Sequence, residues 1–138
     1  MEEIRTVVLE RAAAVAAKDP HKMLAHNAPG IVEYTLAPPL RQPESTVASV
    51  SAWLATFEGP MSLEVTELAV TAGDDVAFCT SLNRLTATPK GRSESFSLWF
   101  RSTLGLRKVA GRWLVTHEHE SVPFEMDGTF KASTDLRP

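Results

Sequence analysis

The chain has 138 residues, of which 43% are apolar and 22% charged, a balance that fits one globular domain able to fold alone. Its net charge of −3 and lack of a basic stripe argue against nucleic-acid binding, and no apolar run approaches the roughly 20 residues of a membrane span. An acidic start argues against a secretory leader, and the lone Cys79 cannot form an intrachain disulfide, so we expect a cytoplasmic protein.

The first half of the chain is predicted to form two helices, then a strand, then a third helix. Apolar residues at helical spacing predict a helix over residues 2–18. A short second helix begins after Asp19, a plausible cap, with Pro20 in its first turn. A strand over residues 30–36 follows, and the apolar face of residues 43–59 predicts a third helix that ends at a Gly-Pro pair.

The second half changes to the alternating pattern of strands. Short turns separate four predicted strands, which indicates an antiparallel meander. These strands cover residues 62–72, 76–87, 95–108 and 112–122. Because the helices precede the meander, we expect an α+β domain whose helices cover one face of the sheet. The domain should span residues 1–124, with 125–138 as an extended tail.

The last hairpin decides which side chains share a face. A three-residue loop at 109–111 places Arg101 opposite His119 and Thr103 opposite His117. One face then holds a mostly polar set, namely Trp99, Arg101, Thr103, Val115, His117 and His119. The other face is mostly aliphatic and carries Leu98, Phe100, Leu104, Leu106, Leu114, Glu118 and Glu120. A cavity with aromatic walls fits the first set, and a second subunit would cover the aliphatic one.

Three segments carry a resemblance to a known superfamily. They read "DPHKMLAHNAPGIVEY", "GDDVAFCTSLNRL" and "GRWLVTHEHESVPF". With the order of the elements, they make the chain similar to the nuclear transport factor 2-like superfamily, in particular to bacterial SnoaL-like and ketosteroid-isomerase-like proteins. The resemblance implies a cone-shaped, curved antiparallel sheet wrapped around the N-terminal helices, a pocket at the wide end, and a homodimer formed through the sheets. It does not settle function, because the scaffold serves both enzymes and binding subunits.

The isomerase residues can be compared one by one. The resemblance puts the isomerase's catalytic base at Tyr34, while the adjacent Glu33 would point the other way. Its oxyanion acid falls at Thr103, and no aromatic residue stands on the first helix to supply its tyrosine. Steroid isomerisation is therefore not expected. The alignment also places Ser81 and Asn83, with Cys79, on the pocket side.

The two histidines allow three interpretations. His117 or His119 could exchange protons as a catalytic base, both could be metal ligands, or both could simply satisfy polar neighbours. No carboxylate shares their predicted face to complete a ligand set, so we expect no metal. We also expect no organic cofactor, because isomerisation, cyclisation and dehydration need only proton transfers.

The remaining candidates would contact the ligand. Arg101 could clamp a carboxylate or enolate, or form an internal salt bridge. Tyr34 could donate a proton to a carbonyl oxygen, or be an ordinary core tyrosine. Trp99 is a candidate wall of the pocket, and Trp53 is a weaker one that could equally be core packing.

These residues predict a protein that binds a small apolar molecule with a carbonyl or carboxylate group. As an enzyme it would be a cofactor-independent isomerase, cyclase or dehydratase that only transfers protons. The alternative is a non-catalytic module for ligand binding or dimerisation.

Overall fold

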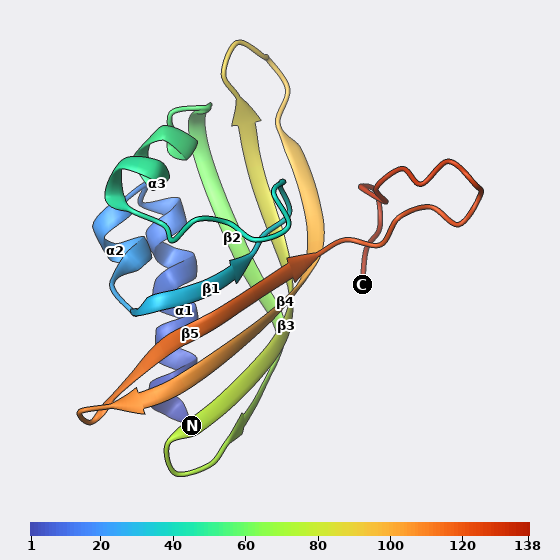
Figure 1. Cartoon of the computed structure of the whole chain (residues 1–138). Coiled ribbons are helices and arrows are strands. Elements are labelled where there is room, and N and C mark those ends of the chain that lie inside the picture. The colour runs from blue at the N-terminus through green and yellow to red at the C-terminus, as the bar shows by residue number, and fades with distance from the viewer.

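The structure is a computed structural model that covers residues 1–138, with three helices beside a five-stranded sheet (Figure 1). The helices are α1 (Glu2–Ala16), α2 (Pro20–Leu24) and α3 (Val47–Leu54). The strands are β1 (Asn27–Tyr34), β2 (Phe57–Ala72), β3 (Val76–Pro89), β4 (Phe96–Val109) and β5 (Arg112–Ser121). Every predicted element is present, and the predicted α+β fold is confirmed.

The helix boundaries follow from local chemistry. The Asp19 side chain accepts a hydrogen bond from the Lys22 N–H at 3.1 Å, so the predicted cap of α2 is confirmed. Thr46 and Ser49 form a reciprocal capping box at the start of α3. α3 ends at Leu54, earlier than expected, because Phe57 already belongs to β2. None of the three helices combines the length and the apolar character needed to cross a bilayer.

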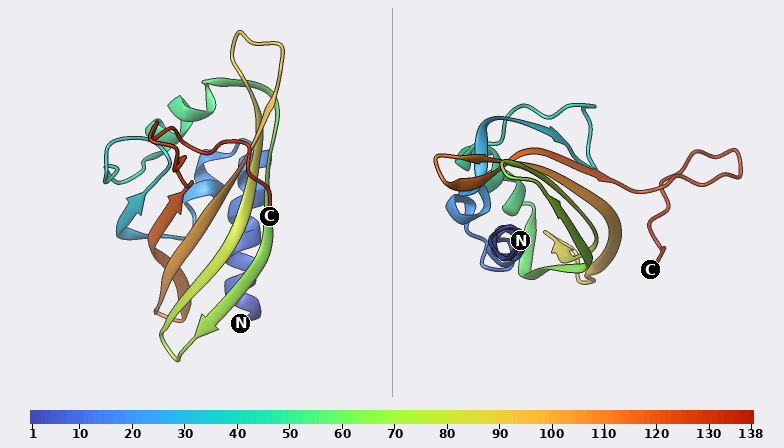
Figure 2. Two further views of the ribbon diagram at one scale, coloured as in Figure 1. Left: turned by 90° about the vertical axis from the view of Figure 1, so that its right-hand side faces the viewer. Right: turned by 90° about the horizontal axis from the view of Figure 1, so that it is seen from below.

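The sheet has the order β1-β5-β4-β3-β2 and curves around α1, which is seen end-on in the right-hand view of Figure 2. The predicted meander of β2 to β5 is antiparallel throughout. β1 instead runs parallel to β5, with Glu33 beside Glu118 and Tyr34 beside His119. This parallel edge was not predicted from the sequence, and it brings the end of β1 next to the end of β5.

The core fills the concave side of the sheet. Ile4, Val7 and Val8 of α1 pack in one cluster with Leu104, Leu106 and other sheet residues. Leu106 and Val115 are 1% and 0% exposed. The aliphatic face of β4 is therefore the covered face, and the expectation that it lies bare for a second subunit was wrong.

The β4–β5 hairpin differs from the predicted one in two ways. Its turn has two residues, Ala110 and Gly111, both with positive φ (51° and 80°), rather than three. A β-bulge then leaves Thr116 unpaired, since Leu106 lies opposite Val115 but Gly105 lies opposite His117.

These two changes shift the predicted pairs by two residues. Arg101 lies opposite Ser121 and Thr103 opposite His119, so both predicted pairings were wrong. A shift of two keeps each side chain on its strand face. Arg101, Thr103, His117 and His119 therefore still share one face.

Residues 122–138 leave the end of β5 and stand away from the sheet (Figure 1). They fold back on themselves through a hydrogen bond from Ser133 N–H to the Pro123 carbonyl at 2.8 Å. The rings of Phe124 and Phe130 lie 5.4 Å apart, centre to centre. This segment contains neither helix nor sheet strand.

We predict that Leu106→Ala lowers the free energy of unfolding by about 2–5 kcal/mol, because it leaves a cavity between α1 and the sheet. Urea unfolding at neutral pH measures this change. The matched control is Leu40→Ala, whose side chain is 98% exposed and whose loss should leave stability nearly unchanged. Equal effects of the two variants would contradict the assignment of the concave face as the core.

Candidate functional site

The helices cover the opposite sheet face from the one predicted to form the pocket. Phe100, Ser102 and Leu104 are buried, whereas Arg101 and Thr103 between them are exposed. The predicted pocket face of β4 is therefore the outer face of the sheet. Arg101, Thr103, His117 and His119 were grouped correctly, but Val115 lies on the covered face instead, and the assignment of the polar group to the covered side was wrong.

The three residues predicted to be catalytic do come together, on that outer face. The Tyr34 ring meets His117 and His119 edge-on, at centroid distances of 5.0 and 5.4 Å. The Nδ1–H of His117 donates to the Val32 carbonyl at 2.7 Å, which fixes that ring against β1. His119 is exposed, and Tyr34 is 36% exposed.

The other outer-face candidates have ordinary surface contacts. Arg101 is exposed and donates from Nε to Ser121 Oγ at 3.1 Å, so it is not the buried cation that would require an anion. Neither predicted arrangement, an anion clamp on the covered face or an internal salt bridge, fits this position. Trp99 lies under the guanidinium of Arg84 at 5.4 Å. Trp53, on α3, packs edge-on against Phe57 and is 39% exposed.

Two predicted ligand-binding residues do lie inside. Ser81 and Asn83 are buried on the concave face of β3, and Ser81 Oγ donates to Asn83 Oδ1 at 2.8 Å. Ser102 of β4 lies directly opposite Ser81. This part of the cone is therefore lined by hydroxyl and amide groups rather than by aliphatic side chains.

Next to this polar wall lies a group that the sequence analysis missed, the acidic cluster, which consists of Glu33, Glu118, Glu120 and Arg11. The Thr116 bulge places Glu118 and Glu120 opposite the inward-facing Leu104 and Ser102. Glu33 is 6% exposed and lies beside Glu118 across the parallel β1–β5 pair. Glu33 thus faces inward and Tyr34 outward, which reverses the orientation expected from the isomerase comparison.

Most members of the acidic cluster are held by hydrogen bonds. Arg11 forms a salt bridge from its Nη2 to Glu118 Oε2 at 2.6 Å and donates its Nη1–H to Asn27 Oδ1. The Glu33 carboxylate accepts from the N–H and the hydroxyl of Ser45, each at 3.2 Å. Arg11 therefore ties α1 to β5, and Ser45 ties the loop before α3 to β1.

Glu120 is the exception, because its carboxyl group lies near other charged groups but forms no hydrogen bond. Burial, and then the neighbouring Glu118 and Glu33, raise the pKa of Glu120 from 4.5 to about 8, against a lowering effect of Arg11. Three carboxyl groups beside one guanidinium cannot all be ionised cheaply. Glu120 therefore carries a proton at neutral pH and is able to donate it.

Glu120 also borders a pocket. An open pocket of about 680 Å³ lies between the loop of residues 35–41 and the end of β5. Tyr34, His119 and Glu120 line it together with apolar groups of the loop, among them Leu36 and Pro39. The pocket thus combines an apolar wall with a phenol, an imidazole and a protonated carboxyl group, which is the composition of many small-molecule sites.

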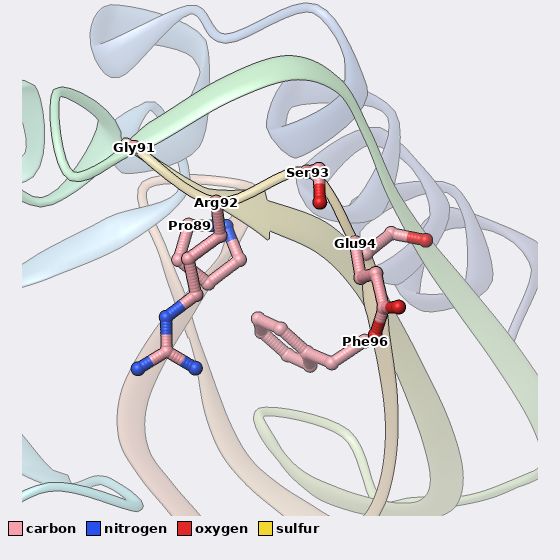
Figure 3. Close-up of a pocket in the computed structure, with 7 residues that line it drawn as sticks. Pro89, Gly91, Arg92, Ser93, Glu94 and Phe96 are labelled. Carbon is pink, nitrogen blue, oxygen red and sulfur yellow. The ribbon is translucent and has the colours of Figure 1, made fainter.

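A second pocket, of about 470 Å³, lies in the β3–β4 loop (Figure 3). In the close-up the Phe96 ring lies between the side chains of Arg92 and Glu94, both of which are exposed. None of the candidate residues or of the acidic cluster lines this pocket. We therefore place the candidate site at the acidic cluster and the adjoining pocket.

The signal for the acidic cluster was present in the stretch "HEHE" at residues 117–120. Its acids and histidines alternate, so one set must face the helices once the strand pairs on both sides. The histidines are the more obvious candidates because imidazoles are common in catalytic and metal-binding sites. The acids face the helices because of a β-bulge, and no pattern in the sequence predicts that bulge.

Comparison with known proteins agrees with this fold. The family described as "SnoaL-like domain" matches residues 4–125. An NTF2-like protein of unknown function from Pseudomonas putida KT2440 is 32% identical, with a TM-score of 0.85 over 99% of this chain and 95% of that one. A ketosteroid isomerase-like protein from Erwinia carotovora atroseptica is 19% identical, with a TM-score of 0.67 over 87% and 93% of the two chains. No curated protein matches the sequence.

We predict that Glu120→Gln changes how stability depends on pH. The folded state holds the Glu120 proton up to a pKa of about 8, whereas the unfolded chain releases it at the ordinary value of 4.5. The wild type therefore loses stability as pH rises through this window, since its folded state binds more protons than its unfolded state. Glutamine has no proton to lose. The free energy of unfolding of the variant, relative to that of the wild type, should therefore rise steadily as pH rises from 4.5 to 8.

Urea unfolding at a series of pH values measures this effect. Glu94→Gln is the matched control, because Glu94 is an exposed acid of the β3–β4 loop and removing its charge should leave the slope unchanged. Parallel curves for the wild type and Glu120→Gln would show that Glu120 titrates normally.

Proposed function

Because the chain belongs to the SnoaL-like domain family, we propose that it binds a small, largely apolar molecule beside the acidic cluster and transfers protons on it without a cofactor. The observation that carries the proposal is Glu120, an acid without a partner that borders the pocket and keeps its proton at neutral pH. Isomerisation, cyclisation and dehydration all need such a group, able both to give and to take a proton near neutrality.

The roles within the site follow from the hydrogen bonds. Glu120, which carries a proton, protonates the substrate oxygen, and His119 takes the proton from the adjacent carbon. Glu118 is neutralised by Arg11 and Glu33 is held by Ser45, so these two acids orient the site rather than react. Ser81, Asn83 and Ser102 are buried and do not line this pocket.

Tyr34 and His119 keep a proposed role at the mouth of the pocket. Both line it with Glu120, and their rings contact each other. His119 is exposed and therefore able to exchange protons between the pocket and water. His117 is restrained by the Val32 carbonyl, which favours a structural role for that ring.

We predict that the protein accelerates α-proton exchange or double-bond migration in small neutral ketones. Proton NMR of cyclohexanone in D2O measures the exchange, and ultraviolet absorbance measures the conversion of 3-cyclohexenone to its conjugated isomer. Glu120→Gln should lower the rate by about 10²-fold or more, the usual contribution of a general acid or base. Glu94→Gln should retain full activity.

The alternative remains a ligand-binding module without chemistry. Ketones that shift the NMR signals of His119 and Tyr34 but show neither exchange nor isomerisation would favour that module. Ketones that react equally fast with the wild type and Glu120→Gln would remove Glu120 from the mechanism.

We also propose a homodimer that uses the outer sheet face, and a cytoplasmic location in keeping with the single free Cys79. The support for the dimer is apolar surface on β3, where Val76 and Phe78 are 53% and 51% exposed. Exposed apolar side chains on the face of a sheet are typical of an interface. The interface belongs to this face, and not to the aliphatic row of β4 that was expected to form it.

For the dimer we predict that the wild type sediments as two copies at micromolar concentration and that Phe78→Glu sediments as one, because a buried unpaired carboxylate opposes association. Leu9→Glu is the control, since Leu9 is equally exposed, at 54%, but lies on α1. A monomeric wild type would remove the dimer proposal.

A further inference from the structure

We infer that the candidate site accepts an uncharged ligand group, a ketone or an alcohol, and rejects a carboxylate. This inference rests on the proposed site and narrows its substrate class, since the sequence alone allowed both carbonyl and carboxylate compounds. The inference follows because the other members of the acidic cluster already form hydrogen bonds or a salt bridge, and only the Glu120 carboxyl group has no partner.

The only cation of the cluster is already in use. Arg11 directs one terminal nitrogen to Glu118, at 2.6 Å, and the other to Asn27. The side chains of Arg11 and Glu118 are only 14% and 17% exposed, so their charges attract each other with little screening by water. An anionic ligand would have to break this pair, which would leave Glu118 buried without a counter-charge.

The acids of the cluster would repel an anion directly. Glu33 is directed toward Ser45 and Glu118 toward Arg11, and the charges of both act on Glu120. A carboxylate placed beside Glu120 would thus meet two like charges and no unpaired cation. An uncharged oxygen meets no such repulsion and accepts the hydrogen bond that the Glu120 carboxyl group offers.

A second guanidinium group, that of Arg41, lies near the candidate site. Arg41 lines the pocket from the loop of residues 35–41, but its side chain is exposed. Water and salt screen a charge at that position, so Arg41 attracts anions only to the rim of the pocket. Selectivity beside Glu120, the one member of the acidic cluster that lines the pocket, is set by the charges around that residue.

The test compares three probes of similar size and different charge: acetophenone, benzyl alcohol and benzoate. NMR titration at neutral pH follows the side-chain carboxyl carbon of Glu120 and the ring signals of His119. We expect the two neutral probes to bind the wild type about tenfold or more tightly than benzoate, since like charges in a partly buried site repel strongly.

Glu118→Gln narrows the selectivity, because it frees the charge of Arg11 for a ligand. Benzoate should then bind at least several-fold more tightly than to the wild type, while the neutral probes change little. Glu64→Gln is the matched control: Glu64 also pairs with an arginine, Arg84, but on the outer face, where both side chains are nearly half exposed. It changes the net charge equally and should leave benzoate binding unchanged.

Each outcome bears on a distinct claim. Benzoate that binds the wild type as tightly as acetophenone overturns the inference but leaves the proposed site standing, and loss of that binding in Arg41→Gln would trace it to the rim. No effect of any probe on Glu120 or His119 would overturn the proposed site itself. The wild-type comparison decides the inference even if Glu118→Gln does not fold.

Discussion

The candidate site depends on one extra residue in β5. Thr116 has no partner on β4, and its side chain donates to the Gly105 carbonyl at 3.2 Å. Before this bulge, Trp113 and Val115 face the helices. After it the alternation is reversed, so that Glu118 faces inward and His117 outward. Without the bulge, the two histidines would lie inside the cone and the acids would lie in water.

The inward acids are tolerated because the helix layer supplies a compensating charge. Arg11 lies one turn beyond the aliphatic contacts of Val7 and Val8 on α1, where the apolar core of the cone gives way to a polar region. Its bonds to Glu118 and Asn27 join α1 to β5 and to the start of β1. A buried pair of this kind adds little net stability, but removing either partner leaves an uncompensated charge. The pair therefore fixes the position of α1 over the polar end of the sheet.

The sequence was sufficient to predict the order and type of all eight elements, the cap at Asp19, and the side chains that share a face of β4. These features depend on local periodicity and turn chemistry, which are visible in one chain. Which face the helices cover is a tertiary choice, and the polar row from Trp99 to Thr103 pointed to the wrong answer. The correct signal was the buried apolar row of Phe100, Leu104 and Leu106, of which the two leucines pack in one cluster with α1.

The bulge and the parallel β1 edge could not be predicted for a different reason. A bulge changes register by one residue at little local cost, and Thr116 is an unremarkable strand residue. Parallel pairing of β1 with β5 joins segments more than eighty residues apart, and no local pattern specifies it. Local patterns could therefore place Glu118 and Glu120 beside Leu104, but they could not bring Glu33 to these two acids.

The acidic cluster lowers the stability of the fold at neutral pH, and this cost is itself an indication of a functional role. Ser102 and Glu120 continue the inner rows in which Leu104 and Val115 pack tightly, and an apolar pair there would extend the core. A carboxyl group there is desolvated, lies near two other acids and has no hydrogen-bond partner of its own, which is why its pKa rises to about 8. Groups with strongly shifted pKa values beside a pocket are characteristic of sites that move protons. The outer-face cluster of Tyr34, His117 and His119 carries no comparable cost, since its rings contact water and each other. The energetic asymmetry between the two faces therefore supports the proposal that Glu120, rather than His117, is the reacting group of "HEHE".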